Sequence, residues 1–403
     1  MQGPLSGIKV LDLSRVLAGP WAGQLLADYG AEVIKVERPG VGDDTRQWGP
    51  PWLRTEDGTE TGESAYFLSS NRNKKSITVN MSNPAGQELI RELAAQSDIL
   101  LENYRVGTLS RFGLDAPALL GVCPTLIYCS ISAYGQDGPR SREPGYDAMM
   151  QASAGLMSLT GEPDGMPQKT GVAITDILTG MYAASAVLAA LNARHRTGAG
   201  QHIDVPLFDT QVACLANQAM SYLVSNEVPP RYGNAHPSIV PYQAFETADG
   251  YLMLAVGNDR QFAACATGLG LAELANDTRF VHNRDRVSHR EELVELLAAK
   301  ILESPTSDWL KKFAELGVPS GPINDLSQVF SHPQIAERGL LQFLSHPVAG
   351  KTPVVANPVR FSSTPASLRS APPLLGEHTD EILLNTLGYS AAKIVALRAE
   401  GTI

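Results

Sequence analysis

The stretch GVAITDILTGMYAASAVLAAL, residues 171–191, carries a single carboxylate, Asp176, at the front of an apolar run with helical spacing. The exposed N–H groups and the dipole of a helix start favour an acid there, so Thr175-Asp176 is typical of an ordinary capping pair. A carboxylate held at a helix N-terminus is also predicted to stay ionised, and it can attack an activated acyl group as a nucleophile. The spacing alone does not choose between the two roles.

Other candidate groups carry weaker signals. Tyr146-Asp147 opens another predicted helix, where the acid is a cap by default, and His236 lies in the polar, loop-like segment GNAHPSIVPYQAF. The eight histidines form neither HxH nor HExxH, which argues against metal catalysis. The sequence contains neither GxSxG nor a P-loop motif.

Basic side chains gather in predicted loops within the first 111 residues of a chain whose net charge is −10. Ligands of open α/β sheets bind beyond the carboxyl ends of strands, where such side chains can hold phosphates by charge-assisted hydrogen bonds. Each one, taken alone, is equally typical of a solvated surface charge. These residues are Arg38, Arg46, Arg72, Lys74, Lys75 and Arg111.

The elements that must position these groups alternate between strand and helix. Residues 7–37 predict a βαβ unit, with Pro20 at the helix start and Gly30 at its end. A second cycle has a helix after Asn83-Pro84 and the strands DILLE and TLIYCSIS, which predicts a parallel sheet covered on both faces. The first strand–helix loop, SRVLAGPWAG, lacks GxGxxG, so an NAD-dependent oxidoreductase is disfavoured.

The alternation of strands and helices gives way to a different sequence pattern near residue 226. YQAFETADGYLMLAVG predicts a hairpin that turns at Asp249-Gly250, and short helices follow it. We therefore expect a large domain over residues 1–200 and a smaller α+β domain over 226–325.

The overall composition and charge limit the classes of function that the chain can have. With 403 residues, 43% of them hydrophobic, the chain can bury a large core in one to three domains. Its net charge of −10 argues against nucleic acid and anionic membrane surfaces as partners. Four cysteines without CxxC spacing and the lack of a leader-like start predict a cytoplasmic protein. The apolar residues 177–191 are too few for a membrane span and predict a buried helix.

Six segments resemble the class III CoA-transferases, the family of formyl-CoA transferase and carnitine CoA-transferase, in order and spacing over nearly the whole chain. They are GIKVLDLSRVLAGPWAGQLLADYGAEVIKVERPGVGDDTRQWGPP, NRNKKSITVNM, DILLENYRVGTLSRFGL, IYCSISAYGQDGP, GYDAMMQASAGLMSLTG and GVAITDILTGMYAASAVLAALNARHRTGAGQHIDV. The resemblance implies an α/β fold with a Rossmann-like large domain, to which residues 330–403 return, and a smaller α+β domain. It also implies an interlocked homodimer.

The resemblance further implies that Asp176 is the catalytic nucleophile and that coenzyme A or acyl-CoA is a substrate, with no permanently bound cofactor and no metal. Tyr146 and Asp147 match an aromatic–acid pair beside the active site. Formyl-CoA transferase has a glycine run where this chain has AVGNDRQF, and a glutamine where it has Leu17. The positions that match CoA contacts are Val16, Ala18, Arg38, Lys75, Asn103, Tyr104, Thr108 and Arg111.

Further segments, including AHPSIVPYQAF and PPLLGEHT, resemble family members that move CoA from succinyl-CoA onto glutarate. A bidentate arginine would suit the distal carboxylate of such an acceptor, and we consider Arg15, Arg46 and Arg72 for that role. His236 is a further candidate for substrate contact. Oxalate, malate, itaconate, mesaconate and carnitine-type acceptors stay open.

Two other functions are compatible with parts of the pattern. The first is an isomerase of the α-methylacyl-CoA racemase type, which is disfavoured because Tyr146 stands where that enzyme has its histidine and tyrosine is a poor base near neutral pH. The second is a non-catalytic CoA-binding protein, which would bind CoA without a covalent adduct at Asp176.

Overall fold

The structure is a computed structural model that describes residues 3–403. It divides into two compact units. Unit 1 holds the residues up to 156 together with 170–223 and 334–403, and unit 2 holds 157–169 and 224–333.

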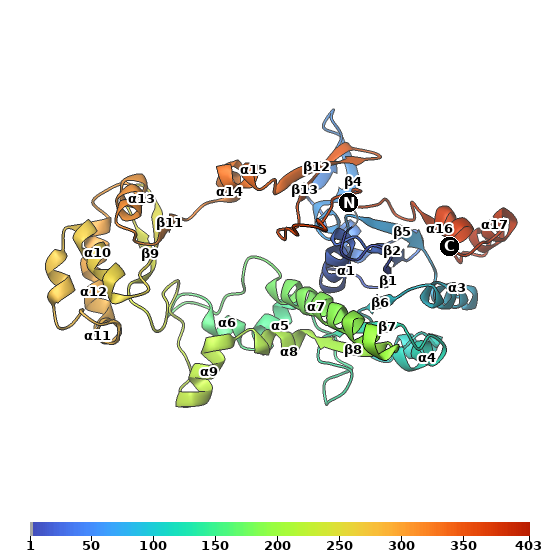
Figure 1. The fold of residues 1–403 in the computed structure, drawn as a ribbon, viewed down its shortest axis with the longest axis horizontal. Coiled ribbons are helices and arrows are strands. Elements are labelled where there is room, and N and C mark those ends of the chain that lie inside the picture. The colour runs from blue at the N-terminus through green and yellow to red at the C-terminus, as the bar shows by residue number, and fades with distance from the viewer. Residues whose placement is uncertain (1–2) are drawn as a thin grey trace. The chain divides into compact units, whose positions relative to one another are not determined.

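Unit 1 is built on a six-stranded parallel sheet with the order β5-β2-β1-β6-β7-β8 (Figure 1). The chain runs outward from β1 in one direction through β2 and β5, and in the other direction through β6, β7 and β8. The point between β1 and β6 is therefore the topological switch point, where open α/β sheets bind ligands. The predicted Rossmann-like α/β fold is confirmed. The strands are β1 (Lys9–Asp12), β2 (Glu32–Glu37), β5 (Lys74–Thr78), β6 (Ile99–Glu102), β7 (Ile127–Ser132) and β8 (Gln201–Pro206).

Helices α1 (Ala18–Asp28) and α7 (Ile174–Thr197) cover one face of this sheet, against side chains such as Val10 of β1 and Leu101 of β6. The two helices approach closely at Gly180. A Cβ atom there would lie 2.6 Å from the carbonyl oxygen of Ala18, which a side chain cannot tolerate. Glycine therefore lets the second turn of α7 approach the start of α1 closely.

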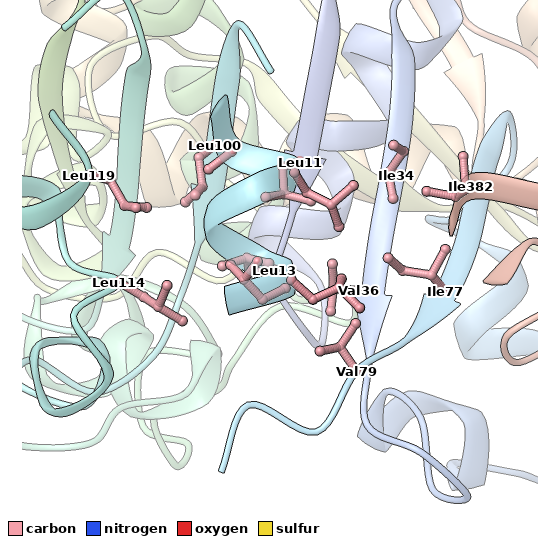
Figure 2. Close-up of a cluster of buried hydrophobic side chains, with 14 of the residues drawn as sticks. Leu11, Leu13, Ile34, Val36, Ile77, Val79, Leu100, Leu114, Leu119 and Ile382 are labelled. Atoms are coloured by element: carbon pink, nitrogen blue, oxygen red, sulfur yellow. The ribbon is translucent and has the colours of Figure 1, made fainter. Parts of the chain in front are cut away.

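The opposite face is covered by helices from both ends of the chain: α3 (Pro84–Ala95), α4 (Ala116–Val122), α16 (Thr379–Asn385) and α17 (Ala391–Ala399). Figure 2 shows this core, in which Ile34 and Ile77 of the sheet lie beside Ile382 of α16, and Leu11 lies on the other side of Ile34. Neighbouring residues of one strand, such as Val10 and Leu11, serve opposite faces, which explains why the strands are apolar throughout.

Helix α7 is the one helix of the described residues with the length and apolarity of a membrane span, but half of its most apolar window is buried inside the fold. Ala183, Val187 and Leu191 of this helix belong to the core under the sheet. The packing is that of a buried core helix.

Shorter elements complete unit 1. They are η1 (Asp44–Gln47), the hairpin of β3 (Trp52–Arg54) and β4 (Glu60–Ser64), α2 (Ala65–Leu68), η2 (Leu109–Phe112), α5 (Asp147–Ser153), α8 (Leu207–Ala213), α9 (Ala216–Ser225) and the hairpin of β12 (Leu341–His346) and β13 (Gly350–Val355).

Unit 2 contains a three-stranded antiparallel sheet with the order β11-β10-β9. Tyr251 pairs with Glu246, which confirms the predicted hairpin with its turn at Asp249-Gly250. Its strands are β9 (Tyr242–Glu246), β10 (Tyr251–Ala255) and β11 (Ser320–Pro322), and its longest helices are α10 (Asp259–Leu269), α12 (Arg290–Ile301) and α13 (Thr306–Glu315).

Candidate active site

Two cavities of unit 1 open beside the switch point. The larger, of about 720 Å³, follows the ends of β2 and β5, and the smaller, of about 250 Å³, contains Asp176. Arg15, Asp44 and Tyr104 line both cavities, so the two adjoin at the loops that follow β1 and β6. This is the place where a doubly wound sheet is expected to bind its ligand.

The loops after β1 and β6 are tied together across the switch point. The Oδ1 atom of Asn103 accepts a hydrogen bond from the Arg15 N–H at 2.9 Å, and its Nδ2 atom donates to the Arg15 carbonyl at 2.7 Å. Val16 follows with a φ of 72°, a left-handed conformation that is rare for a β-branched residue. Its N–H lies 3.2 Å from an oxygen of Asp43, which holds this strained backbone in place.

Four buried charges lie beneath these loops and compensate one another. We call Asp12, Lys35, Asp43 and Lys74 the paired cluster. Lys35 Nζ lies 2.8 Å from Asp43, and Lys74 Nζ lies 3.0 Å from Asp12, with all four side chains removed from solvent. Burial alone would raise the pKa of Asp43, but Lys35 outweighs it and lowers the pKa to about 2. Burial lowers the pKa of Lys74 to about 8, against the opposing effect of Asp12.

Asp176 lies in the first turn of α7 and is 8% exposed. Burial raises its pKa to about 7, and the negative charge of Asp147 adds to the effect. Within residues 3–403, no side chain donates a hydrogen bond to the Asp176 carboxylate and no cation forms an ion pair with it. The pKa of Asp176 therefore lies near neutral pH instead of in the usual range of an aspartate, and the helix start does not offset the effect of burial.

The N–H groups at the start of α7 do not serve the Asp176 carboxylate, because Asp147 of α5 accepts hydrogen bonds from them. Its Oδ1 atom accepts hydrogen bonds from the backbone N–H of Thr175 at 2.8 Å and of Asp176 at 3.3 Å. Gln151 Nε2 donates to the other Asp147 oxygen at 2.6 Å and fixes its orientation. Asp147 is thus confirmed beside Asp176, and together we call them the acid pair.

Tyrosine side chains border the acid pair. Tyr146, the residue before α5, lines the smaller cavity and is largely exposed. Tyr66 of α2 was not expected from the sequence. Burial, followed by the charges of Asp176 and Asp147, raises the pKa of Tyr66 to about 12, so its phenol stays protonated. No sequence signal singles it out, because its proximity to α7 arises only in the fold.

The start of α1 faces the same cavity. Leu17 and Ala18 line it, and no side chain caps the first turn of this helix. An uncapped helix start leaves backbone N–H groups available for an anion or a developing oxyanion. Leu17 offers no side-chain amide there, as expected from the sequence.

The predicted CoA contacts divide into three groups. Val16, Ala18, Asn103 and Tyr104 line the smaller cavity, while Arg38, Thr108 and Tyr104 line the larger one. Arg111 lines no described cavity but belongs to η2, next to Phe112, which does line the larger one. Lys75 lines neither cavity. Its ammonium group forms ion pairs with Glu32 at 3.3 Å and with Glu381 at 2.9 Å.

The three arginines considered for a distal carboxylate have different environments. Arg46 is buried, with Nε and Nη2 at 2.7 and 2.8 Å from the two oxygens of Glu37. Arg72 is buried against Asp28, with Nε at 3.0 Å. Both guanidinium groups are committed to structural ion pairs and neither lines one of the two cavities, so the geometry does not support a substrate role for them.

Arg15 does line both cavities, and its Nη1 atom lies 3.0 Å from Asp44. Arg105, which the sequence reasoning missed, also lines the cavity of Asp176. The signal from which it could have been found is its position directly after Asn103-Tyr104, at the end of a strand beside the switch point.

His236 belongs to unit 2, where its Nδ1 atom accepts a hydrogen bond from Ser238 N–H at 3.0 Å. The segment AVGNDRQF also belongs to unit 2. There Asn258 caps α10 through the Gln261 N–H at 2.9 Å, and the Gln261 side chain accepts from Gly257 N–H at 2.8 Å. These mutual contacts give this segment a defined conformation in place of a run of glycines.

The geometry of unit 1 suits acyl transfer to a carboxylate. A buried, unpaired carboxylate lines a small cavity, an uncapped helix start faces it, and a larger cavity with basic side chains adjoins it. A carboxylate with poor solvation and no counterion is basic and reactive toward an activated acyl group.

Comparison with known proteins agrees with this chemistry. Residues 5–379 match the family model of CoA-transferase family III. The chain is similar to the mouse protein named succinyl-CoA:glutarate CoA-transferase, with 49% identity over 99% of this chain and 90% of the relative. It is 47% identical to the succinate–glutarate CoA-transferase of Agrobacterium fabrum, over 94% of this chain and 95% of that one. A solved CAIB/BAIF family protein from Brucella suis superposes with a TM-score of 0.84 and 47% identity, over 95% of this chain and 99% of that one.

Proposed function

The chain belongs to CoA-transferase family III, and from that premise we propose that it moves CoA from succinyl-CoA to glutarate with Asp176 as the nucleophile. The names of the mouse and Agrobacterium relatives support these two substrates. The observation that carries the proposal is Asp176 itself, a buried carboxylate that lines a cavity and has no cationic partner among residues 3–403. Perturbed and uncompensated groups in clefts are typical of catalytic sites.

The larger cavity suits the nucleotide end of CoA. Three acids line its wall, and each is already paired with a cation: Glu37 with Arg46, Asp43 with Lys35 and Asp44 with Arg15. Arg38 lines the same wall and has no acidic partner among the described residues, so it is available to a phosphate group. The adjoining smaller cavity would then receive the thioester end beside Asp176.

In the proposed reaction the Asp176 carboxylate attacks the succinyl thioester carbonyl. The C–S bond breaks, the CoA thiolate leaves, and an aspartyl–succinyl anhydride forms. The thiolate then attacks the aspartyl carbonyl, which releases succinate and leaves an aspartyl-CoA thioester. Glutarate attacks that thioester, the C–S bond breaks, and an aspartyl–glutaryl anhydride forms as the CoA thiolate leaves. The thiolate then attacks the glutaryl carbonyl, which gives glutaryl-CoA and frees the Asp176 carboxylate. No water, proton or nucleotide is consumed overall.

Two features of unit 1 assist these steps. The uncapped first turn of α1 presents N–H groups where oxyanions develop at the attacked carbonyls. The burial of Asp176 also excludes water, which would otherwise hydrolyse the anhydride and the thioester.

The test is formation of glutaryl-CoA from succinyl-CoA and glutarate, followed by chromatography with mass detection. The proposal predicts stoichiometric exchange of succinyl-CoA for glutaryl-CoA plus succinate, with little free CoA. Release of free CoA without glutaryl-CoA would identify a thioesterase instead. No reaction with any carboxylic acid acceptor would favour a non-catalytic CoA-binding role.

We also propose that the chain acts as an interlocked homodimer. Helix α9 buries none of its residues within the chain, and its apolar side chains Met220 and Leu223 are 57% and 71% exposed. Apolar surface of this kind is typical of a face covered by a partner. Light scattering coupled to size exclusion should give about twice the chain mass of 43.1 kDa, and a monomer at micromolar concentration would contradict the proposal.

A further inference from the structure

We infer that Arg105 recognises the distal carboxylate of the dicarboxylate substrate and so determines the preference of the enzyme for dicarboxylates over monocarboxylates. This inference rests on the proposed function. Arg105 is an exposed residue in the loop that follows β6, and it lines the 250 Å³ cavity that contains Asp176 as well as a further cavity of about 340 Å³ that the same loop lines.

The charges on the cavity wall single out Arg105. The other charged residues around Asp176 are already paired: Arg15 with Asp44 at 3.0 Å, and Glu143 with Arg140 at 2.8 Å. Arg105 has no acidic partner among residues 3–403. It is therefore the cation of this wall whose charge is not neutralised, in the same cavity lining as Asp176.

The guanidinium of Arg105 also has donors to spare. Its Nη2 atom donates to the carbonyl oxygen of Arg142 at 3.0 Å, which anchors the side chain on the loop before α5. An arginine has five N–H donors, and Nη2 carries two of them, so the second Nη2 hydrogen remains, together with either Nε–H or Nη1–H, for a carboxylate in bidentate geometry. The hydrogen bond to Arg142 positions the guanidinium, and its remaining donors can bind an anion.

Arg15 suits this role less well than Arg105. Its guanidinium is held between Asp44 and the ring of Tyr104, at 5.3 Å from the ring centroid, and it lies where the two cavities adjoin. That position is on the path toward the larger cavity, where the CoA chain would pass. The distal carboxylate belongs at the acyl end, inside the smaller cavity.

A dicarboxylate substrate reacts at Asp176 through one of its carboxylates. Its second carboxylate needs an attractive contact, because the negative charges of the acid pair alone would repel it. A charge-assisted hydrogen bond to a carboxylate corresponds to roughly 10- to 100-fold in kcat/KM. A monocarboxylate of the same chain length makes no such contact and loses nothing when Arg105 is replaced.

The experiment compares glutarate with pentanoate as acceptors, each with the same succinyl-CoA donor, in Arg105→Gln, Arg105→Lys and wild type. Gln keeps an N–H donor for the Arg142 carbonyl but removes the charge. We expect Arg105→Gln to lower the glutarate-to-pentanoate ratio of kcat/KM about 10- to 100-fold, and Arg105→Lys to lower it less. The matched control is Arg142→Gln, which keeps the anchoring carbonyl and should leave the ratio unchanged.

The possible failures are distinguishable. If wild type transfers CoA to neither acid, the proposed function itself fails. If the wild type prefers glutarate and Arg105→Gln keeps that preference, Arg105 does not bind the distal carboxylate and the inference is overturned. An equal loss for both acceptors would show that Arg105 only anchors the loop through Arg142, and it would overturn the inference.

Discussion

Unit 1 buries charge in two places, and the two places are built in opposite ways. In the paired cluster, every carboxylate lies within 3.0 Å of a lysine ammonium group. In the acid pair, Asp176 and Asp147 lie side by side with no cation among the described residues. The paired cluster shapes the backbone of the cavity, whereas the acid pair keeps a carboxylate reactive. Compensated burial supports structure, and uncompensated burial supports chemistry.

The same contrast gives the two sites opposite responses to pH. The pKa of Asp43 is lowered to about 2 from 3.8, so its contribution to stability is present above pH 4 and is lost as the pH falls toward 2. The pKa of Asp176 is raised to about 7, so the folded state binds a proton that the unfolded chain releases. Its ionisation therefore costs stability as the pH rises from about 4 to 7.

The largest expected effect is on turnover. Asp176→Ala removes the nucleophile and should lower kcat by roughly 10³-fold or more, while the fold is kept. A coupled assay of glutaryl-CoA formation measures kcat, and circular dichroism measures whether the fold is kept. Asp209→Ala, which removes an exposed first-turn acid of α8, is the matched control. Turnover within tenfold of wild type in Asp176→Ala would remove Asp176 from the mechanism.

The next effect is on the paired cluster. Lys35→Met leaves Asp43 buried without its counterion and should lower the free energy of unfolding by about 3–5 kcal/mol. Urea denaturation at pH 7 measures this change. Breaking the exposed pair of Arg140 and Glu143 with Arg140→Ala should cause no resolvable change. A loss below 1 kcal/mol in Lys35→Met would mean that the cluster is not what holds the Val16 loop.

Removing the buried charge of Asp176 should raise the free energy of unfolding instead of lowering it. Asp176→Asn should raise the free energy of unfolding at pH 8 by up to about 4 kcal/mol, because the pKa of Asp176 is near 7 in the fold against 3.8 unfolded. The gain should vanish below pH 4, where both states bind the proton. Denaturation curves from pH 4 to 8 measure it, and a variant less stable than wild type at pH 8 would show that Asp176 has an unseen partner.

The smallest effect is a change in pH dependence. Asp147→Asn keeps an oxygen for the N–H groups of α7 but removes the charge that raises the pKa of Asp176. The acid limb of the kcat/KM profile, near pH 7 in wild type, should then move by roughly one pH unit to lower pH. Profiles from pH 5 to 9 test this, and an unmoved limb would mean that burial alone sets the pKa.

The sequence predicts the elements of unit 1 better than their electrostatics. The buried helix expected from the apolar residues 177–191 is α7, Ile174–Thr197, because its apolar spacing and Gly198 at its end are local signals. Strand β5 was missed, since its first residues are Lys74 and Lys75. Lys74 can be buried in this edge strand because Asp12, 62 residues earlier in the chain, forms an ion pair with it. No local pattern reveals such a partner.

The site shows the same limit. Asp176 and Asp147 were found from the sequence, yet the raised pKa of Asp176 depends first on its burial and then on the charge of Asp147, and both are set by the packing of the fold. Arg46 and Arg72 looked available in the sequence, but Glu37 and Asp28 bind them in the fold. Arg105 looked ordinary and is the unneutralised cation of the cavity.

Trapping the covalent intermediate tests the central claim most directly. The protein is mixed with succinyl-CoA, quenched with hydroxylamine or borohydride, and analysed by intact-protein and peptide mass spectrometry. The account predicts a modification confined to the peptide that contains Asp176, absent from Asp176→Ala. An unmodified protein that still binds CoA, or a modification at another residue, would contradict it.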